Sequence, residues 1–253
     1  MNRLTVIKDL MKQRNLRDYL EIGVHTGYIF FRIKSTFKVA VDPGFEFGSM
    51  GTWNKAFNFP YNLYNKYFEI TSDDFFLKHA KDVFKQTKPD IIFIDGMHEY
   101  QFALRDIENT LQYMPDNGVI VVHDCNPKSK EAGSSFKEFS ENAYGGFWNG
   151  DVWKAILHLR CMRKDVNVFV LDCDHGLGII TKKTPESTLP FTQADIEKFD
   201  YDDFAKNREQ WLNLKRPEYF YEYFKITDTS NRSFRKIVKS VLVALHVLPG
   251  KKG

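Results

Sequence analysis

The chain has 253 residues, of which 43% are hydrophobic and 27% are charged, and its formal net charge is +3. This length suits one large domain with appendages, and the composition excludes disorder over most of the chain. The net charge is too small for a surface that binds nucleic acid throughout, and no basic run interleaved with aromatic residues precedes the C-terminal tail. We therefore expect no nucleic-acid partner.

The opening residues 1–15 mix polar and apolar side chains, which predicts a short amphipathic helix rather than a signal peptide. No run of about 18 apolar residues occurs, so no transmembrane helix is expected. The three cysteines, Cys125, Cys161 and Cys173, form neither a CxxC pair nor a disulfide framework. These features together predict a cytoplasmic protein.

Short apolar runs alternate with helical patterns from Asp18 to about Lys183, which predicts an α/β fold with helices on both faces of a mostly parallel sheet. The expected strands are residues 19–22, 38–41, 66–69, 91–94, 119–122, 166–171 and 177–181. The connection 172–176 is too short for a crossover helix, so it must be a hairpin. One strand near the sheet edge is therefore expected to run antiparallel.

Two glycines, Gly23 and Gly27, follow the first expected strand and precede a helical pattern at residues 28–36. Glycines at a strand-to-helix turn let the backbone approach a ligand closely. The spacing differs from G-x-G-x-x-G, and Glu21 before the turn suits a cationic ligand better than a diphosphate. A simple tight turn remains the alternative.

Acidic residues also follow the second and third strands. Asp42 lies roughly 20 positions after the first turn, where a carboxylate can accept both hydroxyls of a ribose. The alternative is that it begins a turn before Pro43. Ser72 and Asp73 could bond an adenine amino group or cap the next helix.

Asp95 and Asp124 end the fourth and fifth strands, so both should face the same crevice, with His98 and His123 beside them. Two carboxylates with imidazoles can hold a divalent cation, and Asp favours Mg²⁺ or Mn²⁺. The alternatives are a helix cap for Asp95, a buried core histidine for His123 and a pocket-lining role for His98.

Four segments carry a resemblance: Glu-Ile-Gly-Val-His-Thr-Gly at 21–27, Val-Asp-Pro at 41–43, Phe-Ile-Asp-Gly-Met-His-Glu-Tyr at 93–100 and Gly-Val-Ile-Val-Val-His-Asp at 118–124. Their order and spacing resemble class I S-adenosylmethionine-dependent methyltransferases, most closely the small-molecule and sugar O-methyltransferases of bacterial biosynthetic clusters. The resemblance covers about residues 15–183 and implies a Rossmann-like sheet whose last strand inserts antiparallel. The residues expected to contact S-adenosylmethionine are Glu21, Gly23, Thr26, Gly27, Asp42, Ser72, Asp73, Asp95 and Gly96.

In metal-dependent members of this group, an acidic residue after the fourth strand and an acidic pair after the fifth hold Mg²⁺. Here the pair is His123 and Asp124, so the expected ligands of Mg²⁺ or another divalent cation are Asp95, His123 and Asp124. The expected chemistry is in-line attack of an acceptor hydroxyl on the sulfonium methyl. A metal would lower the hydroxyl pKa. Without one, His98 or His123 would remove the proton and Asp124 would orient the imidazole.

The acceptor is expected near residues 147–154. Trp148 could stack on a sugar or aromatic ring, whereas Lys154, with Arg160, could pair with an anionic acceptor. Trp153 is expected instead on the apolar face of a helix. A small molecule or a sugar or glycan is the expected acceptor.

The expected methyltransferase domain is residues 1–185, with residues 186–253 as a helical C-terminal extension. Its tail, residues 231–248, alternates basic and apolar residues. Such a helix could contact the inner face of a membrane peripherally, pack on its own domain or join a second subunit in a homo-oligomer. Two other function classes stay open: an NAD-dependent oxidoreductase on a similar sheet, and a non-catalytic binding protein of the same fold.

Overall fold

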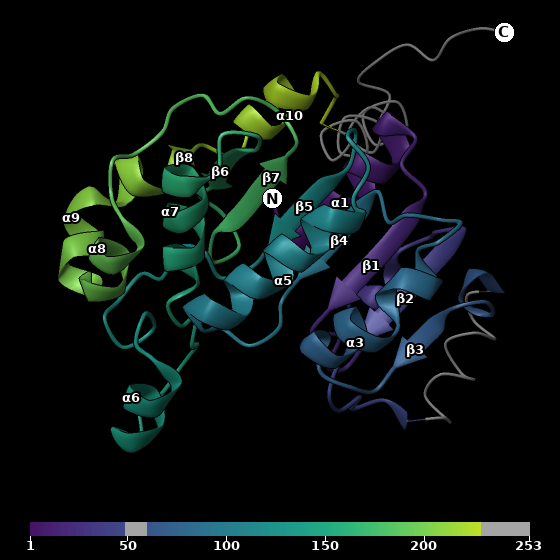
Figure 1. Ribbon diagram of the computed structural model, residues 1–253, viewed down its shortest axis with the longest axis horizontal. Coiled ribbons are helices and arrows are strands. Elements are labelled where there is room, and N and C mark those ends of the chain that lie inside the picture. The colour runs from purple at the N-terminus through teal and green to yellow at the C-terminus, as the bar shows by residue number, and fades with distance from the viewer. Residues whose placement is uncertain (49–59, 229–253) are drawn as a thin grey trace, which may run out of the picture.

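The protein is described here by a computed structural model, which covers residues 1–48 and 60–228. One sheet of eight strands runs through it in the order β3-β2-β1-β4-β5-β7-β6-β8 (Figure 1). The strands are β1 (Asp18–Ile22), β2 (Phe37–Val41), β3 (Lys66–Phe68), β4 (Ile91–Ile94), β5 (Val119–Val122), β6 (Asn167–Leu171), β7 (Leu177–Thr181) and β8 (Leu214–Lys215). The seven predicted strands are confirmed to within one residue at each end, and only β8 was not predicted.

The strand directions confirm the mostly parallel sheet with one reversed strand. β1 to β5 pair in parallel, β7 lies antiparallel between β5 and β6, and β8 pairs in parallel with β6. β1 lies between β2 and β4, so the strand order reverses there. Its last residue, Ile22, pairs with Val41 and Ile94, and the segments that follow these three strands therefore begin at one level. Ligands of open α/β sheets bind at such a switch point.

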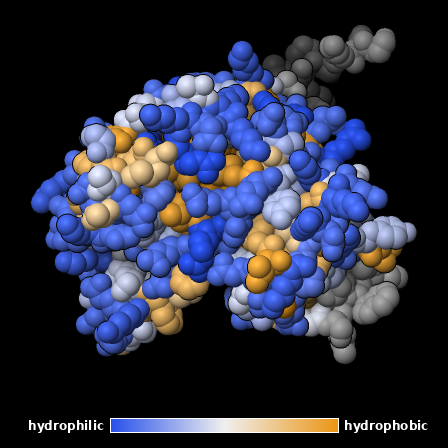
Figure 2. All heavy atoms as spheres, in the orientation of Figure 1, coloured by the Kyte–Doolittle hydropathy of each residue, from blue (hydrophilic) through white to orange (hydrophobic). Residues whose placement is uncertain are grey.

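Helices cover both faces of the sheet, as predicted (Figure 1). Helices α3, α4, α5 and α7, with α8 and α9 beyond α7, pack on one face, and α1 and α10 pack on the other. Figure 2 shows that the first face is largely hydrophilic on its outside, with isolated apolar spots. The helices are α1 (Arg3–Arg14), α3 (Ser72–Lys78), α4 (Ala80–Val83), α5 (Tyr100–Tyr113), α6 (Phe136–Glu141), α7 (Val152–Met162), α8 (Gln193–Lys198), α9 (Tyr201–Leu212) and α10 (Tyr219–Phe224).

The helix expected at residues 28–36 is wrong, because this segment forms only the short 3₁₀ turn η1 (Phe30–Arg32). Lys38 of β2 explains the difference. Its buried ammonium group donates to the carbonyl of Phe30 (2.7 Å), which a helix over residues 28–36 would pair with the N–H of Lys34, and to the carbonyl of Ile33 (3.0 Å). The side chains of Phe30 and Phe31 are buried in the core, so the segment is held by packing rather than by helical hydrogen bonds.

The described part of the C-terminal extension, residues 186–228, contains α8, α9 and α10 and packs on the sheet domain. Trp153 of α7 is buried and stacks on Phe204 and Trp211 of α9, with ring centroids 4.7 and 5.9 Å apart. This confirms its expected place in the core. Arg160 is also buried and donates to the carbonyl of Trp211 (2.9 Å), so it caps the end of α9. Its guanidinium is therefore not directed toward an acceptor substrate.

The basic tail at residues 231–248 lies outside the described residues. Among residues 1–48 and 60–228, no helix has the length and hydropathy needed to cross a membrane.

Candidate active site

A cavity of about 640 Å³ opens at the carboxyl ends of β1 to β4. It lies at the switch point of the sheet, where the fold places ligands. Its volume is within the range of small-molecule sites. Predicted cofactor residues that line it are Gly23, Asp42, Ser72, Asp73, Asp95 and Gly96.

The loop after β1 depends on glycine at its first position. Gly23 has a φ of 82°, and a Cβ there would lie 2.0 Å from the carbonyl oxygen of Asp95. Another side chain would force the loop away from the end of β4. Gly23 therefore keeps the backbone close to the cavity, which is what a cofactor-binding turn after the first strand requires.

Asp42 is held in place by backbone donors. Its Oδ2 accepts from the N–H of His25 and its Oδ1 from the N–H of Gly44, both at 2.8 Å. A carboxylate oxygen has a second acceptor position, so both oxygens can still receive ligand hydroxyls. The geometry suits a ribose diol at this point of the cavity.

Three of the expected cofactor residues do not line the cavity. Glu21 is buried and accepts a hydrogen bond from the hydroxyl of Tyr19 (2.6 Å). Burial raises the pKa of Glu21 to about 8, so a neutral carboxyl group lies beneath the glycine loop. Thr26 is exposed, whereas Gly27 is buried beside the ring of Phe31.

Ser72 and Asp73 face the cavity from the start of α3. The N-cap of α3 is Thr71, whose hydroxyl accepts from the N–H of Asp74 (3.2 Å), so the capping alternative for Ser72 is wrong. Asp73 forms an ion pair of 2.9 Å with Arg105 of α5. The hydroxyl of Ser72 does not cap α3 and instead forms a hydrogen bond with the side chain of Asp106.

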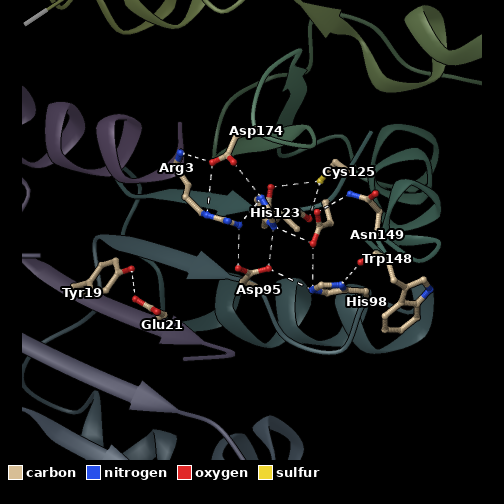
Figure 3. A network of polar contacts seen from close by, with 12 residues as sticks. Arg3, Tyr19, Glu21, Asp95, His98, His123, Cys125, Trp148, Asn149 and Asp174 are labelled. Carbon is tan, nitrogen blue, oxygen red and sulfur yellow. Dashed lines mark hydrogen bonds and ion pairs between the residues drawn. The ribbon is translucent and has the colours of Figure 1, made fainter. Parts of the chain in front are cut away.

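Beyond β4 and β5, two carboxylates and two imidazoles form a closed cluster (Figure 3). Nδ1 of His123 lies 3.0 Å from Asp95 Oδ1 and 2.9 Å from Asp124 Oδ2. Nε2 of His98 lies 3.3 Å from the same two oxygens. Asn149 donates to the other oxygen of Asp124 (2.6 Å). The residues predicted after the two strands are thus brought together.

The cluster has the donor set of a divalent-cation site. Nδ1 of His98 lies 3.1 Å from the carbonyl of Trp148, which can only accept, so the proton of a neutral ring belongs there. The lone pair of Nε2 then faces the two carboxylates. Ligand atoms of Asp95, His98 and Asp124 lie within 4.8 Å of one another. Such oxygen and imidazole donors suit Mn²⁺ or Mg²⁺.

The group of possible cation ligands contains His98, whereas the histidine expected from the sequence was His123. His98 lines the cavity, whereas His123 is only 5% exposed and lies behind the two carboxylates. His123 therefore contacts the expected ligands from behind and orients them.

Charge holds the cluster together. Burial by itself would raise the pKa of Asp95, but hydrogen bonds from His123 and His98 outweigh it and hold this pKa well below its ordinary value. Burial likewise disfavours the charged form of His98, yet the carboxylates of Asp95 and Asp124 raise its pKa. The group is thus a network of opposite charges in a largely buried setting.

Two residues that the sequence did not indicate complete this network. Arg3 of α1 contacts Asp95 Oδ2 (3.3 Å) and Nε2 of His123 (2.5 Å) with its Nη1. Its backbone N–H donates to Oδ2 of Asp174 (2.7 Å) in the turn between β6 and β7. Burial lowers the pKa of His123, but Asp124, Asp174 and Asp95 raise it to about 11. An imidazolium has no lone pair at Nε2, so Arg3 and a second proton compete for that atom.

Backbone strain gathers around the crevice. Four non-glycine residues there have left-handed backbones: His25, Asp124, Asp174 and His175, with φ of 50°, 60°, 48° and 62°. By contrast, Asn15 is left-handed at the end of α1, where this conformation is an ordinary helix cap. Strained residues persist where the surroundings hold them and often mark functional sites.

The residues that were expected to contact the acceptor substrate lie in two different places. The ring of Trp148 lies 5.4 Å from that of His98, beside the cluster. Lys154 points elsewhere, with Nζ 3.4 Å from the carbonyl of Glu197 and 3.9 Å from Asp151. Trp148 therefore remains an acceptor candidate by position, and Lys154 lies outside the cluster.

Comparison with known proteins agrees with this fold. Residues 20–125 match a family described as a methyltransferase domain. No curated protein matches the sequence.

Solved structures share the fold at low sequence identity. An O-methyltransferase from Bacillus cereus, solved in complex with S-adenosylhomocysteine, is 16% identical and superposes with a TM-score of 0.50 over 72% of this chain and 80% of its own. The O-methyltransferase TomG from Streptomyces achromogenes, which is involved in tomaymycin synthesis and was solved with S-adenosylmethionine, is 13% identical, with a TM-score of 0.54 over 72% of this chain and 79% of its own. The chain thus has the Rossmann-like methyltransferase fold, and its residues 20–125 match the methyltransferase-domain family.

Proposed function

We propose that this protein transfers the methyl group of S-adenosylmethionine to a hydroxyl group of a small-molecule or sugar acceptor, assisted by a divalent cation. One observation carries the proposal. Asp95 and His98 line the 640 Å³ cavity and also belong to the group of possible cation ligands. The cofactor cavity therefore opens directly onto the cluster that would prepare the acceptor. Two O-methyltransferases of the same fold were solved with S-adenosylhomocysteine and S-adenosylmethionine.

On the cofactor side, the protein binds and orients. Asp42, fixed by two backbone N–H groups, accepts the ribose hydroxyls. Gly23 lets the loop after β1 lie against the end of β4, so the cavity keeps its shape. S-adenosylmethionine supplies an electrophilic methyl group when bound, and the enzyme contributes proximity and orientation.

On the acceptor side, Asp95, His98 and Asp124 would hold the cation. Such a cation lowers the pKa of a hydroxyl group that it binds. His123 and Asn149 contact the two carboxylates from behind and keep their oxygens directed toward His98. If no cation is required, His98 is the imidazole that lines the cavity and is the candidate base.

The acceptor would lie beside Trp148, whose ring neighbours His98. Phe147, the preceding residue, is 78% exposed and lies 5.1 Å from the ring of His175. A half-buried ring and an exposed ring next to a polar centre suit an acceptor that presents a sugar or aromatic ring.

Calorimetric titration with S-adenosylhomocysteine, with and without Mn²⁺, tests this proposal on the full chain. We expect micromolar binding, and Mn²⁺ bound with a stoichiometry of one in an independent electron paramagnetic resonance titration. Turnover of S-adenosylmethionine with a panel of sugar and aromatic hydroxyl compounds should fall after chelation. A protein that binds NADH but not S-adenosylhomocysteine would be an oxidoreductase instead.

A further inference from the structure

Asp106 is a buried carboxyl group that neither the sequence nor the proposed chemistry assigns. It lies on α5 in the apolar stripe that includes Ala103 and Ile107, and it is only 3% exposed. The stripe packs against the sheet, yet Asp106 also lines the 640 Å³ cavity. A carboxyl group in such a place is costly unless it has a purpose or a partner.

The neighbours of Asp106 leave it unneutralised. Ser72 of α3 forms a hydrogen bond with its side chain. Arg105, the adjacent residue on α5, directs its guanidinium to Asp73 instead, at 2.9 Å. Gly96 faces it from the loop after β4, where an added Cβ would lie 3.4 Å from Asp106 Oδ2. In residues 1–48 and 60–228, Asp106 forms no ion pair.

Asp106 lines the same cavity as Asp42, the residue proposed to hold the ribose. Asp42 lies at the end of β2, whereas Ser72 and Asp106 face the cavity from α3 and α5. A nucleoside whose ribose is held by Asp42 would extend its base toward these two helices. Met97 and Phe102 also line the cavity there and supply apolar walls for a flat ring.

We propose that Asp106 recognises the adenine ring of the bound cofactor by pairing with its 6-amino group and a neighbouring ring nitrogen. The inference rests on the proposed function, because it assumes an adenosine cofactor. Adenine presents an amino donor beside a ring-nitrogen acceptor, and an Asn or Gln side chain matches that pair with one acceptor and one donor. A protonated carboxyl group offers the same two groups.

The protonation state agrees with this role. Burial raises the pKa of Asp106 to about 7, and the charge of Asp73 adds to the effect, while Ser72 and Arg105 oppose it. Below this pKa the group can donate to the ring nitrogen and accept from the amino group. Above it, the ionised group loses its donor, so cofactor affinity should fall as the pH rises.

The test is calorimetric titration of S-adenosylhomocysteine into wild type, Asp106→Asn and Asp106→Leu at pH 6 and pH 8.5. We expect wild-type affinity to fall about tenfold at the higher pH. Asp106→Asn should stay within about threefold of wild type at pH 6 and show little pH dependence, because the amide has a permanent donor. Asp106→Leu should bind at least about tenfold more weakly at pH 6.

Two comparisons separate recognition from a structural role. Asp9→Asn alters another buried carboxyl group, on α1 and away from the cavity, and should leave affinity unchanged. The cofactor analogue with hydrogen in place of the 6-amino group should bind wild type more weakly than S-adenosylhomocysteine but should bind Asp106→Leu about equally. Thermal melting of each variant confirms that it is folded.

The outcomes distinguish the two proposals. If wild type binds S-adenosylhomocysteine and the Asp106 variants match it at both pH values, the assignment of Asp106 is wrong and the proposed function stands. If wild type binds no S-adenosylhomocysteine at either pH, both are overturned.

Discussion

The carboxylates in the two halves of the crevice are held by different kinds of partner. At the ends of β1, β2 and β3, Asp42 is held by backbone N–H groups, and the space beside it is a cavity. At the ends of β4 and β5, Asp95 and Asp124 are held by two histidine side chains. The first half is shaped for a ligand, whereas the second is a network that an added cation would reorganise.

This difference indicates how each half should respond to change. Backbone donors persist when a side chain is replaced, so a variant of the cofactor half should lose only the contacts of the replaced side chain and keep its shape. Side chains that hold one another fail together, because a buried charge without its partner is costly. Variants of the acidic and imidazole cluster should therefore have effects beyond the residue replaced.

The largest effect is expected for Asp95→Ala. This change removes a candidate cation ligand and one of the two carboxylates that His98 contacts. Mn²⁺ affinity, measured by electron paramagnetic resonance, should fall by more than about 100-fold, because replacing even an outer partner of a metal ligand commonly costs 10- to 100-fold. Asp73→Ala removes a carboxylate from the same cavity but outside the cluster, so it should leave Mn²⁺ affinity unchanged. Equal losses in both variants would refute a localised site.

Asp42→Ala should have the next largest effect. Loss of two hydrogen bonds to a charged acceptor should weaken S-adenosylhomocysteine binding roughly 10- to 100-fold in calorimetry. Asp42→Asn keeps one acceptor oxygen and should fall between wild type and alanine. Asp116→Ala, an exposed carboxylate in the turn before β5, serves as the control. Wild-type affinity in Asp42→Ala would contradict the ribose assignment.

Arg3→Met tests whether Arg3 orients the cation ligands or only adds a positive charge near them. If Arg3 were only a nearby positive charge, its removal would tighten Mn²⁺ binding. Because Arg3 contacts both Asp95 and His123, we expect binding about tenfold weaker instead. Arg3→Lys keeps the charge but lacks the planar fork and should not restore affinity. Lys8→Met removes an exposed charge from the same helix as a control. Tighter binding in Arg3→Met would disprove the orienting role.

The smallest effect on binding is expected for Glu21→Gln. The pKa of Glu21 is raised from 4.5 to about 8 in the folded protein, so its contribution to stability is present below pH 4.5 and is lost as the pH rises through 8. The variant should therefore melt a few degrees above wild type at pH 9 and within about a degree of it at pH 5. Its affinity for S-adenosylhomocysteine should change by less than about threefold. A large loss of affinity would place Glu21 in contact with the cofactor after all.

Most of the fold follows from patterns local to the sequence. Strands buried on both faces are continuous apolar runs, and β4, β5 and β7 were predicted with the bounds that the structure shows. The helix predicted at residues 28–36 does not form, because the buried Lys38 holds the carbonyls of Phe30 and Ile33 in place and the first of these would be needed within the helix. A tertiary contact of this kind has no local signal.

The same limit applies to the site. Asp95 and Asp124 were predictable because side chains that end neighbouring parallel strands meet at one sheet edge. Arg3 and Asp174 were not, because 171 positions separate them and neither lies in a recognisable motif. Asp106 did leave a signal: it occupies a position on the apolar stripe of a helix, where a carboxyl group is out of place.

The contact between Arg3 and Asp174 has a consequence for the order in which the protein is assembled. The residues of the cofactor cavity lie between positions 22 and 106, so they can come together early as the chain leaves the ribosome. Asp174, which contacts Arg3 and His123, can join the charged cluster only later in synthesis. A nascent chain should therefore be able to bind nucleoside before Asp174 fixes Arg3 and His123 behind the candidate cation ligands.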